Sequence, residues 1–494
     1  MSIQQQYREY LEKVAAYEMA LNTMYWDQLT IAPKKGQSYR TKMMSLLSGE
    51  LFDITTDEKN IALIEQVMVD DESDEITKIE AKQIIKDINT FRYIPKDEYV
   101  QFVQLLGDSE VAWEKAKQND DWDMFKPYLE QLVEQTKRNV RYRKSSDGVY
   151  QQLLEDFEPN MSINQYDEFF NLVKEKLVPL IKKINEKQTK RPAFLDFEVS
   201  LSQQKEFINI LSKALYFTKE NTYTAESVHP FSSSFSVNDN RVTVAYHTDN
   251  FTSSIFSFIH EVGHATYNGQ VDPQLEGRFV AHSMSYGMHE SQSRMFENMI
   301  GRSKAFWKNL FPQIVEIIPE LQSVSLDEFI FGINYVSNSL IRIEADELTY
   351  PLHVLVRYEI EKALFNDEIT VDQLPTIWNE KMQQYLQVKP STNKEGVLQD
   401  VHWSGGSFGY FPTYALGSAY SAQWYHAMSK SVNIEKSLSE NRFDLINDYL
   451  KTTIHKHGGI YSANELFEKV SDEPFNPSYY IDYLTHKYSK LFNI

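Results

Sequence analysis

Through most of residues 1–190, apolar residues recur every three or four positions, which is the spacing of an amphipathic α-helix. The pattern is clearest at 128–147 and 166–188. Each such helix has an apolar face that is stable only when it packs against another element. The sequence therefore predicts a first portion built from helices packed on helices.

Residues 231–248 break this pattern. β-forming residues alternate on both sides of a turn-forming stretch at 238–240, and this arrangement is typical of a β-hairpin. In the second arm, Val242 and Val244 would point to one face and Arg241 to the other. The helical pattern then returns almost to the C-terminus. We therefore expect a mainly α fold with a small sheet just before the next helix.

The least regular connection after the first helices lies at 189–204. With 494 residues, of which 42% are hydrophobic, the chain can bury a large core. We expect one functional unit, 1–494, divided into a helical front portion, 1–190, and a portion that carries the chemistry, 191–494.

Charge and hydropathy exclude several classes of protein. The formal net charge of −20 repels phosphate backbones, so we expect no nucleic-acid partner. No apolar run approaches the roughly 18 residues that span a bilayer, and we expect no membrane association. The charged start of the chain lacks the apolar region of a secretory signal. Together these features favour a cytoplasmic location.

The chain contains no cysteine, which excludes disulfides and thiolate ligands. Any metal must therefore be bound by histidine, aspartate or glutamate. There are 12 histidines. Two of them, His455 and His457, are expected in an exposed turn and not in a second metal site.

The segment SSIFSFIHEVGHATYNG, 253–269, places His260 and His264 four residues apart. On a helix these positions share one face, so both imidazoles can bind one ion. Ser253 or Ser254 is the expected N-cap of this helix. HExxH on a helix is typical of a catalytic zinc site, and two core histidines with a surface glutamate are the alternative interpretation.

A catalytic zinc needs a third protein ligand and one open position. The next predicted helix, 283–303, offers Glu290. His289 is adjacent but would point about 100° away around that helix. Alternatively, Glu290 could form an ordinary salt bridge with Arg294 one turn later.

Glu261 follows the first histidine and is not expected to bind the ion. A carboxylate beside such a site can take a proton from the attacking water and return it to the leaving amine. The predicted chemistry is amide hydrolysis, with Glu261 as general base.

At these residues the sequence resembles the carboxypeptidase Taq family of metallocarboxypeptidases. The resemblance rests on motifs that follow one another in the C-terminal half, together with one N-terminal segment. They are HPF (229–231), DNRVT (239–243), HEVGH (260–264), HESQ (289–292), IRIEAD (341–346), GVLQDVHW (396–403) and MYWDQLTIAPKKGQSYR (24–40).

The resemblance implies a single saddle-shaped, mostly helical peptidase with a deep central cleft, of which residues 1–190 form the front wall. It implies the release of single residues, with broad specificity, from peptides with a free C-terminus. It also implies one Zn²⁺ per chain, for which Co²⁺ sometimes substitutes, and a homodimer.

A carboxypeptidase must bind the terminal carboxylate of its substrate, and arginine does so through two parallel hydrogen bonds. Arg342 belongs to a set of polar residues that recur every four positions and predict a polar stripe on an apolar helix: Asn334, Asn338, Arg342 and Asp346. We expect Arg342 to be the carboxylate clamp, with a surface pair to Asp346 as the alternative.

Arg241 is the rival clamp. By the resemblance it lies where the cleft closes, and hairpin stabilisation by Asp239 is its alternative.

The glycine- and aromatic-rich segment 396–417 is predicted to be a loop. Zinc alone does not fully neutralise the oxyanion of amide hydrolysis, so a further hydrogen-bond donor is expected. His402 is the first candidate and Tyr414 the second. Tyr410 and Gln399 are expected to contact substrate, and Gln399 could instead orient a histidine.

HExxH does not determine which peptide bond is cut. The leading hypothesis is a zinc carboxypeptidase, and the alternative is a zinc endo-oligopeptidase or dipeptidase that uses the same site. A third possibility is a peptide-binding scaffold without catalysis. The presence of Glu261 argues against a scaffold, because binding alone needs no base beside the metal.

Overall fold

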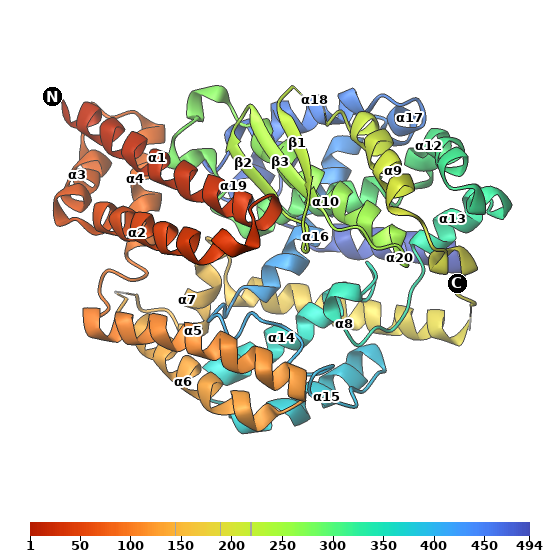
Figure 1. Cartoon of the computed structure of the whole chain (residues 1–494), viewed down its shortest axis with the longest axis horizontal. Helices are drawn as coiled ribbons and strands as arrows, with labels where there is room; N and C mark the ends of the chain where they lie inside the picture. Colours follow the sequence, from red (N-terminus) through yellow and green to blue (C-terminus); the bar gives the residue numbers. More distant parts are fainter. Residues whose placement is uncertain (144, 188, 218–219) are drawn as a thin grey trace. The chain divides into compact units, whose positions relative to one another are not determined.

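The computed structural model describes residues 1–143, 145–187, 189–217 and 220–494. Over these residues the chain is mainly α-helical with one small sheet, as predicted (Figure 1). The two clearest predicted helices correspond to α6 (Trp122–Arg141) and α8 (Ile163–Glu186). Positions 144 and 188, near their predicted ends, lie outside the described residues.

The chain divides into two compact units, each made of three segments. The first unit consists of Met1–Ile88, Arg191–Ile333 and Ser421–Phe475, and the second of Asn89–Lys190, Asn334–Tyr420 and Asn476–Ile494. The expected boundary after residue 190 is one of the crossings. The expected front portion, 1–190, is however shared between the two units. Helices pack through matching apolar faces, and the order of helices along the chain does not show which faces match.

The first unit contains the sheet and the helix with the HExxH sequence. Its helices and strands are α1 (Ile3–Thr30), α2 (Gln37–Thr56), α3 (Glu58–Val69), α4 (Glu75–Ile88), α9 (Leu201–Ala214), β1 (Thr222–Glu226), β2 (Ser232–Ser236), β3 (Asp239–Val244), α10 (Phe251–Gly269), α11 (Tyr286–Arg294), the π-helical η5 (Met295–Ile300), α12 (Lys304–Ile317), α13 (Leu326–Ile333), α17 (Ile434–Ser439), α18 (Phe443–Thr453) and α19 (Ala463–Ser471).

The second unit is helical. Its helices are α5 (Lys96–Asn119), α6, α7 (Val149–Glu155), α8, α14 (Tyr350–Phe365), α15 (Leu374–Leu386) and α20 (Ser478–Phe492), and α16 (Phe411–Ser429) contains the crossing from the second unit into the first, between Tyr420 and Ser421. No helix in the described part of the chain is both long and apolar enough to cross a bilayer.

Within the described residues, the sheet has the strand order β1–β3–β2. β2 and β3 form the predicted antiparallel hairpin, with Ser233 opposite Arg241. The prediction missed β1, which pairs in parallel with β3, although its Thr-Tyr-Thr start is rich in β-forming residues. Val242 and Val244 are fully buried, and α10 packs against β2 and β3 (Figure 1).

Helix α10 begins earlier than predicted. The side chain of Asn250 caps it by accepting a hydrogen bond from the backbone N–H of Ser253, so the expected cap at Ser253 or Ser254 is wrong. Large apolar side chains hold this helix in the core, and burial of each contributes about 1.5–3 kcal/mol. They are Phe251, Ile255, Phe256, Phe258, Ile259 and Val262.

The helix predicted around Arg342 does not form. Between Asn334 and Thr349 the chain is irregular apart from a short 3₁₀ turn, η7 (Arg342–Glu344). The Asp346 carboxylate accepts hydrogen bonds from backbone N–H groups on both sides of it, and the Ser339 hydroxyl accepts another. Short polar side chains therefore satisfy the backbone locally and replace the hydrogen bonds of a helix. The recurrence of polar residues every four positions therefore did not indicate a helix here.

Candidate active site

The predicted metal ligands come together in the first unit. His260 and His264 extend from α10, and Glu290 extends from α11. Glu290 Oε2 lies 3.7 Å from His260 Nε2 and 3.5 Å from His264 Nε2. The three ligand atoms all lie within 4.8 Å of one another.

These separations fit a shared ion better than a set of hydrogen bonds. An N–H···O hydrogen bond spans about 2.7–3.2 Å. Ligand atoms bonded to one tetrahedral ion at about 2.1 Å are separated by roughly 3.4 Å. Two imidazole nitrogens and one carboxylate oxygen are also donors that suit zinc. The residues present therefore fit a divalent metal with an open position left for a further ligand.

Gly263 allows α10 and α11, which carry the three candidate ligands, to approach. A Cβ atom at this position would lie 2.7 Å from Ser293 Cα and 2.8 Å from the Gln292 carbonyl oxygen on α11. Only glycine permits this contact without moving α11. Because Gly263 lies between the two histidines, the close approach brings Glu290 to both of them.

The two oxygens of Glu290 have different partners. Arg294 Nε donates to Oε1 at 2.6 Å, while Oε2 faces the histidines and accepts from the Ser293 hydroxyl at 3.1 Å. The alternative Glu290–Arg294 salt bridge therefore exists alongside the metal-binding arrangement. Burial would raise the pKa of Glu290, but the charges of Arg294 and His260 outweigh it and hold the pKa well below its usual range.

His289 is not part of the ligand cluster. Its ring stacks on the His264 ring with centroids 4.3 Å apart and an angle of 20° between the planes. Burial and the neighbouring His264 hold the pKa of His289 well below that of an ordinary histidine. Its neutral ring thus packs against His264. This agrees with the expectation that His289, about 100° around the helix from Glu290, is not a ligand.

Glu261 lies on α10 next to His260, and its side chain is buried. Burial would lower the pKa of His260, but Glu290, Glu297 and Glu261 together raise it. The candidate base therefore belongs to the same cluster of charges as the ligands.

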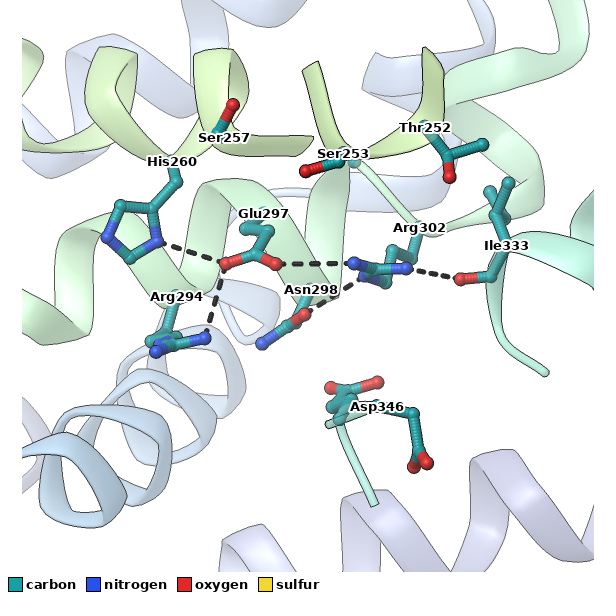
Figure 2. A network of polar contacts seen from close by, with 12 residues as sticks. Thr252, Ser253, Ser257, His260, Arg294, Glu297, Asn298, Arg302, Ile333 and Asp346 are labelled. Carbon is teal, nitrogen blue, oxygen red and sulfur yellow. Dashed lines mark hydrogen bonds and ion pairs between the residues drawn. The ribbon is translucent and has the colours of Figure 1, made fainter. Parts of the chain in front are cut away.

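The sequence analysis missed a polar network on the other side of the His260 ring (Figure 2). Glu297 Oε2 lies 3.0 Å from His260 Nδ1, and Arg294 and Arg302 both donate to the same carboxylate. Burial would raise the pKa of Glu297, but the His260 hydrogen bond and the two arginines lower it to about 2. A signal was present, since Glu297 follows Glu290 by two helical turns in one predicted helix.

The prediction of an exposed turn at His455 is wrong. Its ring is fully buried, with Nδ1 2.8 Å from the Gln270 amide oxygen and Nε2 2.9 Å from that of Gln292. Burial lowers the pKa of His455 to about 3, so the ring is neutral. His455 thereby links the end of α10 to Gln292 on α11, which lies close to Glu290 in the sequence. His457 is half-buried.

The second unit brings together the other candidate residues. Arg342 is buried, and its Nε and Nη2 donate to Asp400 Oδ1 at 3.0 and 2.9 Å. Its Nη1 donates to the Tyr350 hydroxyl at 3.0 Å. The anion that a buried arginine requires is thus Asp400, and the alternative surface pair with Asp346 is absent. The chemistry of a guanidinium leaves one further proton on each Nη nitrogen.

Asp400 also binds a second buried arginine, Arg357, whose Nε lies 2.7 Å from Oδ2. Burial would raise the pKa of Asp400, but the two arginines outweigh it and lower the pKa well below its usual range.

Gln399 connects the same region through hydrogen bonds. Its amide oxygen accepts from the Arg342 backbone N–H and from Arg357, and its amide nitrogen donates to two backbone carbonyls. All four hydrogen-bonding positions of the Gln399 side-chain amide are therefore occupied. Gln399 is thus fully hydrogen-bonded within the protein, while its contact with substrate stays a prediction.

His402, Tyr410 and Tyr414 form one aromatic cluster. His402 Nε2 lies 3.2 Å from the Tyr414 hydroxyl, and the ring of Tyr410 lies 5.6 Å from His402 and 5.1 Å from Tyr414. Tyr414 belongs to the first turn of α16 and not to a loop. The Arg342 guanidinium lies 4.9 Å from the centre of the Tyr414 ring. Burial and the charge of Arg342 lower the pKa of His402 to about 4.

Arg241, the rival clamp, is engaged within its own hairpin in the first unit. Its Nε and Nη2 donate to the two oxygens of Asp239 at 2.7 and 2.6 Å. Its guanidinium lies 4.3 Å from the centre of the Phe235 ring, and its side chain is 27% exposed. The alternative of hairpin stabilisation is therefore observed, while the substrate role stays a prediction.

Comparison with known proteins points to one family. The model of the carboxypeptidase Taq (M32) metallopeptidases matches residues 6–488. The chain is 38% identical to Carboxypeptidase 1 of Bacillus subtilis (strain 168), over 99% of this chain and 98% of that protein. It is 34% identical to Thermostable carboxypeptidase 1 of Thermus thermophilus, over 97% of each. The crystal structure of the M32 carboxypeptidase from Deinococcus radiodurans R1 superposes with a TM-score of 0.96 at 28% identity and covers 100% of both chains.

Proposed function

Because this chain belongs to the carboxypeptidase Taq (M32) family of metallopeptidases, we propose that it is a zinc carboxypeptidase that releases single C-terminal residues from peptides with broad specificity. The observation that carries the proposal is the convergence of His260, His264 and Glu290, with buried Glu261 beside them. That set suits hydrolysis of a peptide bond and has no evident use in a scaffold.

In this proposal His260, His264 and Glu290 hold one Zn²⁺ per chain, and Co²⁺ can replace it. When bound, the ion supplies Lewis acidity toward the attacking water and the scissile carbonyl. Glu261 accepts a proton from that water as its oxygen attacks the carbonyl carbon. The same carboxyl group then delivers the proton to the leaving nitrogen, which departs as the free amino acid.

We assign stabilisation of the developing oxyanion to His402, with Tyr414 as a second donor. The His402 ring is neutral at ordinary pH, and its Nδ1 is buried without a hydrogen-bond partner among the residues that the structure describes. In this proposal that nitrogen carries the ring proton and donates it in a hydrogen bond to the substrate oxygen. Tyr410 packs on both residues and is proposed as a wall of the substrate site.

A pH series tests the protonation state of His402. His402→Ala should lower kcat by about 10²-fold, because one oxyanion donor is lost. The pKa of His402 is lowered to about 4, so the ring is deprotonated above that pH. The ratio of wild-type to variant kcat should therefore be constant between about pH 5.5 and 8.5. A ratio that falls steadily as the pH rises would show that the charged ring is the donor.

Arg342 is proposed as the clamp for the substrate carboxylate, through the protons on its Nη nitrogens that Asp400 and Tyr350 do not take. Arg342→Lys should lower kcat/KM for free-acid peptides by about 30-fold, or about 2 kcal/mol, since lysine cannot form paired hydrogen bonds. Cleavage of the matched C-terminal amides, already poor, should change little.

Arg241→Lys is the matched control for this measurement, because Arg241 also pairs with a carboxylate. Its preference for the free acid should stay within about threefold of wild type. If only the Arg241 variant loses that preference, the clamp lies on the hairpin and the assignment to Arg342 is wrong.

The function itself is tested with one peptide prepared as a free acid and as a C-terminal amide. Mass spectrometry should show a ladder of products, each shorter by one C-terminal residue, from the free acid alone. Internal cleavage of both forms would favour the alternative, an endo-oligopeptidase. An uncut peptide together with hydrolysis of a free dipeptide would favour a dipeptidase. A homodimer is proposed from the sequence resemblance and a cytoplasmic location from the composition, and sedimentation velocity tests the first.

A further inference from the structure

The two ring nitrogens of His260 face two carboxylates of one continuous helical segment. Glu290 on α11 lies on the Nε2 side, and Glu297 on η5 lies on the Nδ1 side. Residues seven apart on a helix return to nearly the same face, about 10 Å further along the axis. The segment therefore presents Glu290 and a second carboxylate, Glu297, to the same imidazole. Figure 2 shows the Glu297 side of the ring.

The Nδ1–Glu297 contact determines which nitrogen carries the proton. Glu297 is buried between two guanidinium groups, with Arg302 Nη2 3.3 Å from Oε1 and Arg294 Nη1 3.3 Å from Oε2. An ionised carboxylate only accepts hydrogen bonds. Its Oε2 lies 3.0 Å from His260 Nδ1, so Nδ1 must be the donor. The lone pair of the neutral ring is then on Nε2, which faces Glu290 and His264.

We propose that Glu297 is the residue that positions His260 for metal binding, by holding its proton on Nδ1 and its ring plane toward the other two ligands. Glu297 does not bind the ion, because it lies on the opposite side of the ring from Nε2. This inference rests on the proposed metal site and adds to it a residue that acts through His260.

Two arginines hold Glu297 in place. Arg302 also donates from Nε to Asn298 Oδ1 at 3.2 Å and from Nη1 to the Ile333 carbonyl, which fixes its guanidinium at the end of η5. Arg294 donates to both Glu290 and Glu297, so it connects the ligand carboxylate with the positioning carboxylate. The arrangement keeps three donors directed at Glu297.

The second ligand histidine is oriented differently. His264 Nδ1 is buried and has no hydrogen-bond partner among the described residues, and its ring stacks on His289. Packing orients His264, whereas a charged hydrogen bond orients His260. Loss of Glu297 should therefore affect the metal site through one ligand alone.

The test is the affinity of the intact protein for Zn²⁺, measured by competition with a chromophoric chelator. Glu297→Gln removes the charge and places an amide N–H₂ group among three donors, so one donor must lose its acceptor. We expect the Kd for Zn²⁺ to rise by about 10- to 100-fold. The matched control is Asn298→Ala, which removes another partner of Arg302 without touching His260. Its Kd should stay within about threefold of wild type.

Equal Kd values for wild type and a folded Glu297→Gln protein would overturn the proposal, as would an equal loss in the Asn298→Ala control. A second measurement needs no variant at Glu297. In metal-free wild-type protein labelled with ¹⁵N-histidine, at a pH where the ring is neutral, the His260 signal, assigned with His260→Gln, should be that of a ring protonated at Nδ1. A neutral ring protonated at Nε2 would overturn it. Both readouts are independent of peptide cleavage, so they stand or fall separately from the proposed activity.

Discussion

Removal of the metal should abolish peptide hydrolysis, and Zn²⁺ or Co²⁺ should restore it. His260, His264 and Glu290 converge on one point, and none of these three side chains can polarise a carbonyl as a bound metal ion does. Two imidazole nitrogens and one carboxylate oxygen suit zinc and cobalt, whereas Mg²⁺ prefers oxygen ligands alone. Magnesium should therefore fail to restore activity.

The measurement is activity against metal content in the same samples, with the metal determined by mass spectrometry after dialysis with a chelator. One equivalent of Zn²⁺ per chain should restore full activity. His264→Gln should lose both metal and activity, while His486→Gln, at an exposed position on α20, should keep both. Full activity in a verified metal-free sample would rule out the metal-dependent mechanism.

Glu261→Gln should keep the metal and lose turnover by about 10²–10⁴-fold. Glutamine has nearly the same shape as glutamate, but its amide cannot accept a proton from water. Glu261 is buried next to a ligand without being one of the three converging groups, so metal affinity should not depend on it. The loss should appear in kcat, because proton transfer belongs to the reaction and not to substrate binding.

Glu206→Gln, at an exposed position on α9, is the matched control and should behave as wild type. The two variants should contain equal amounts of zinc. Near-native turnover of the Glu261 variant with full metal occupancy would remove Glu261 from the role of general base. A loss of metal would instead show that Glu261 supports the ligands.

Predictions agree with the structure where the interacting residues are close together in the sequence. The spacing of His260 and His264 is a local property of one helix, and the geometry of a helix places them on one face without knowledge of any other element. The choice of Glu290 over His289 used the same local geometry, and the structure agrees with it. The hairpin at β2 and β3 was equally accessible, since turn and strands are adjacent in the sequence.

One error has a local cause and another arises from partners that are distant in the chain. The polar residues around Arg342 recur with a helical period, yet the Asp346 carboxylate takes up backbone N–H groups and the helix does not form. His455 looked like part of an exposed turn, but it is buried in the core with Gln270 and Gln292 within hydrogen-bond distance of its two nitrogens. Neither partner is marked by spacing or composition.

Periodicity within short segments was enough to predict the helical class, the hairpin and the shared face of His260 and His264. The approach of Glu290 to these histidines and the pairing of the buried charges depend on tertiary packing. Arg342 and Asp400 are 58 positions apart in the sequence, and His260 and Glu297 are 37 positions apart. A buried charge must find an opposite charge or a hydrogen bond, and the residue that provides it depends on which helices pack together, through contacts that no local pattern records.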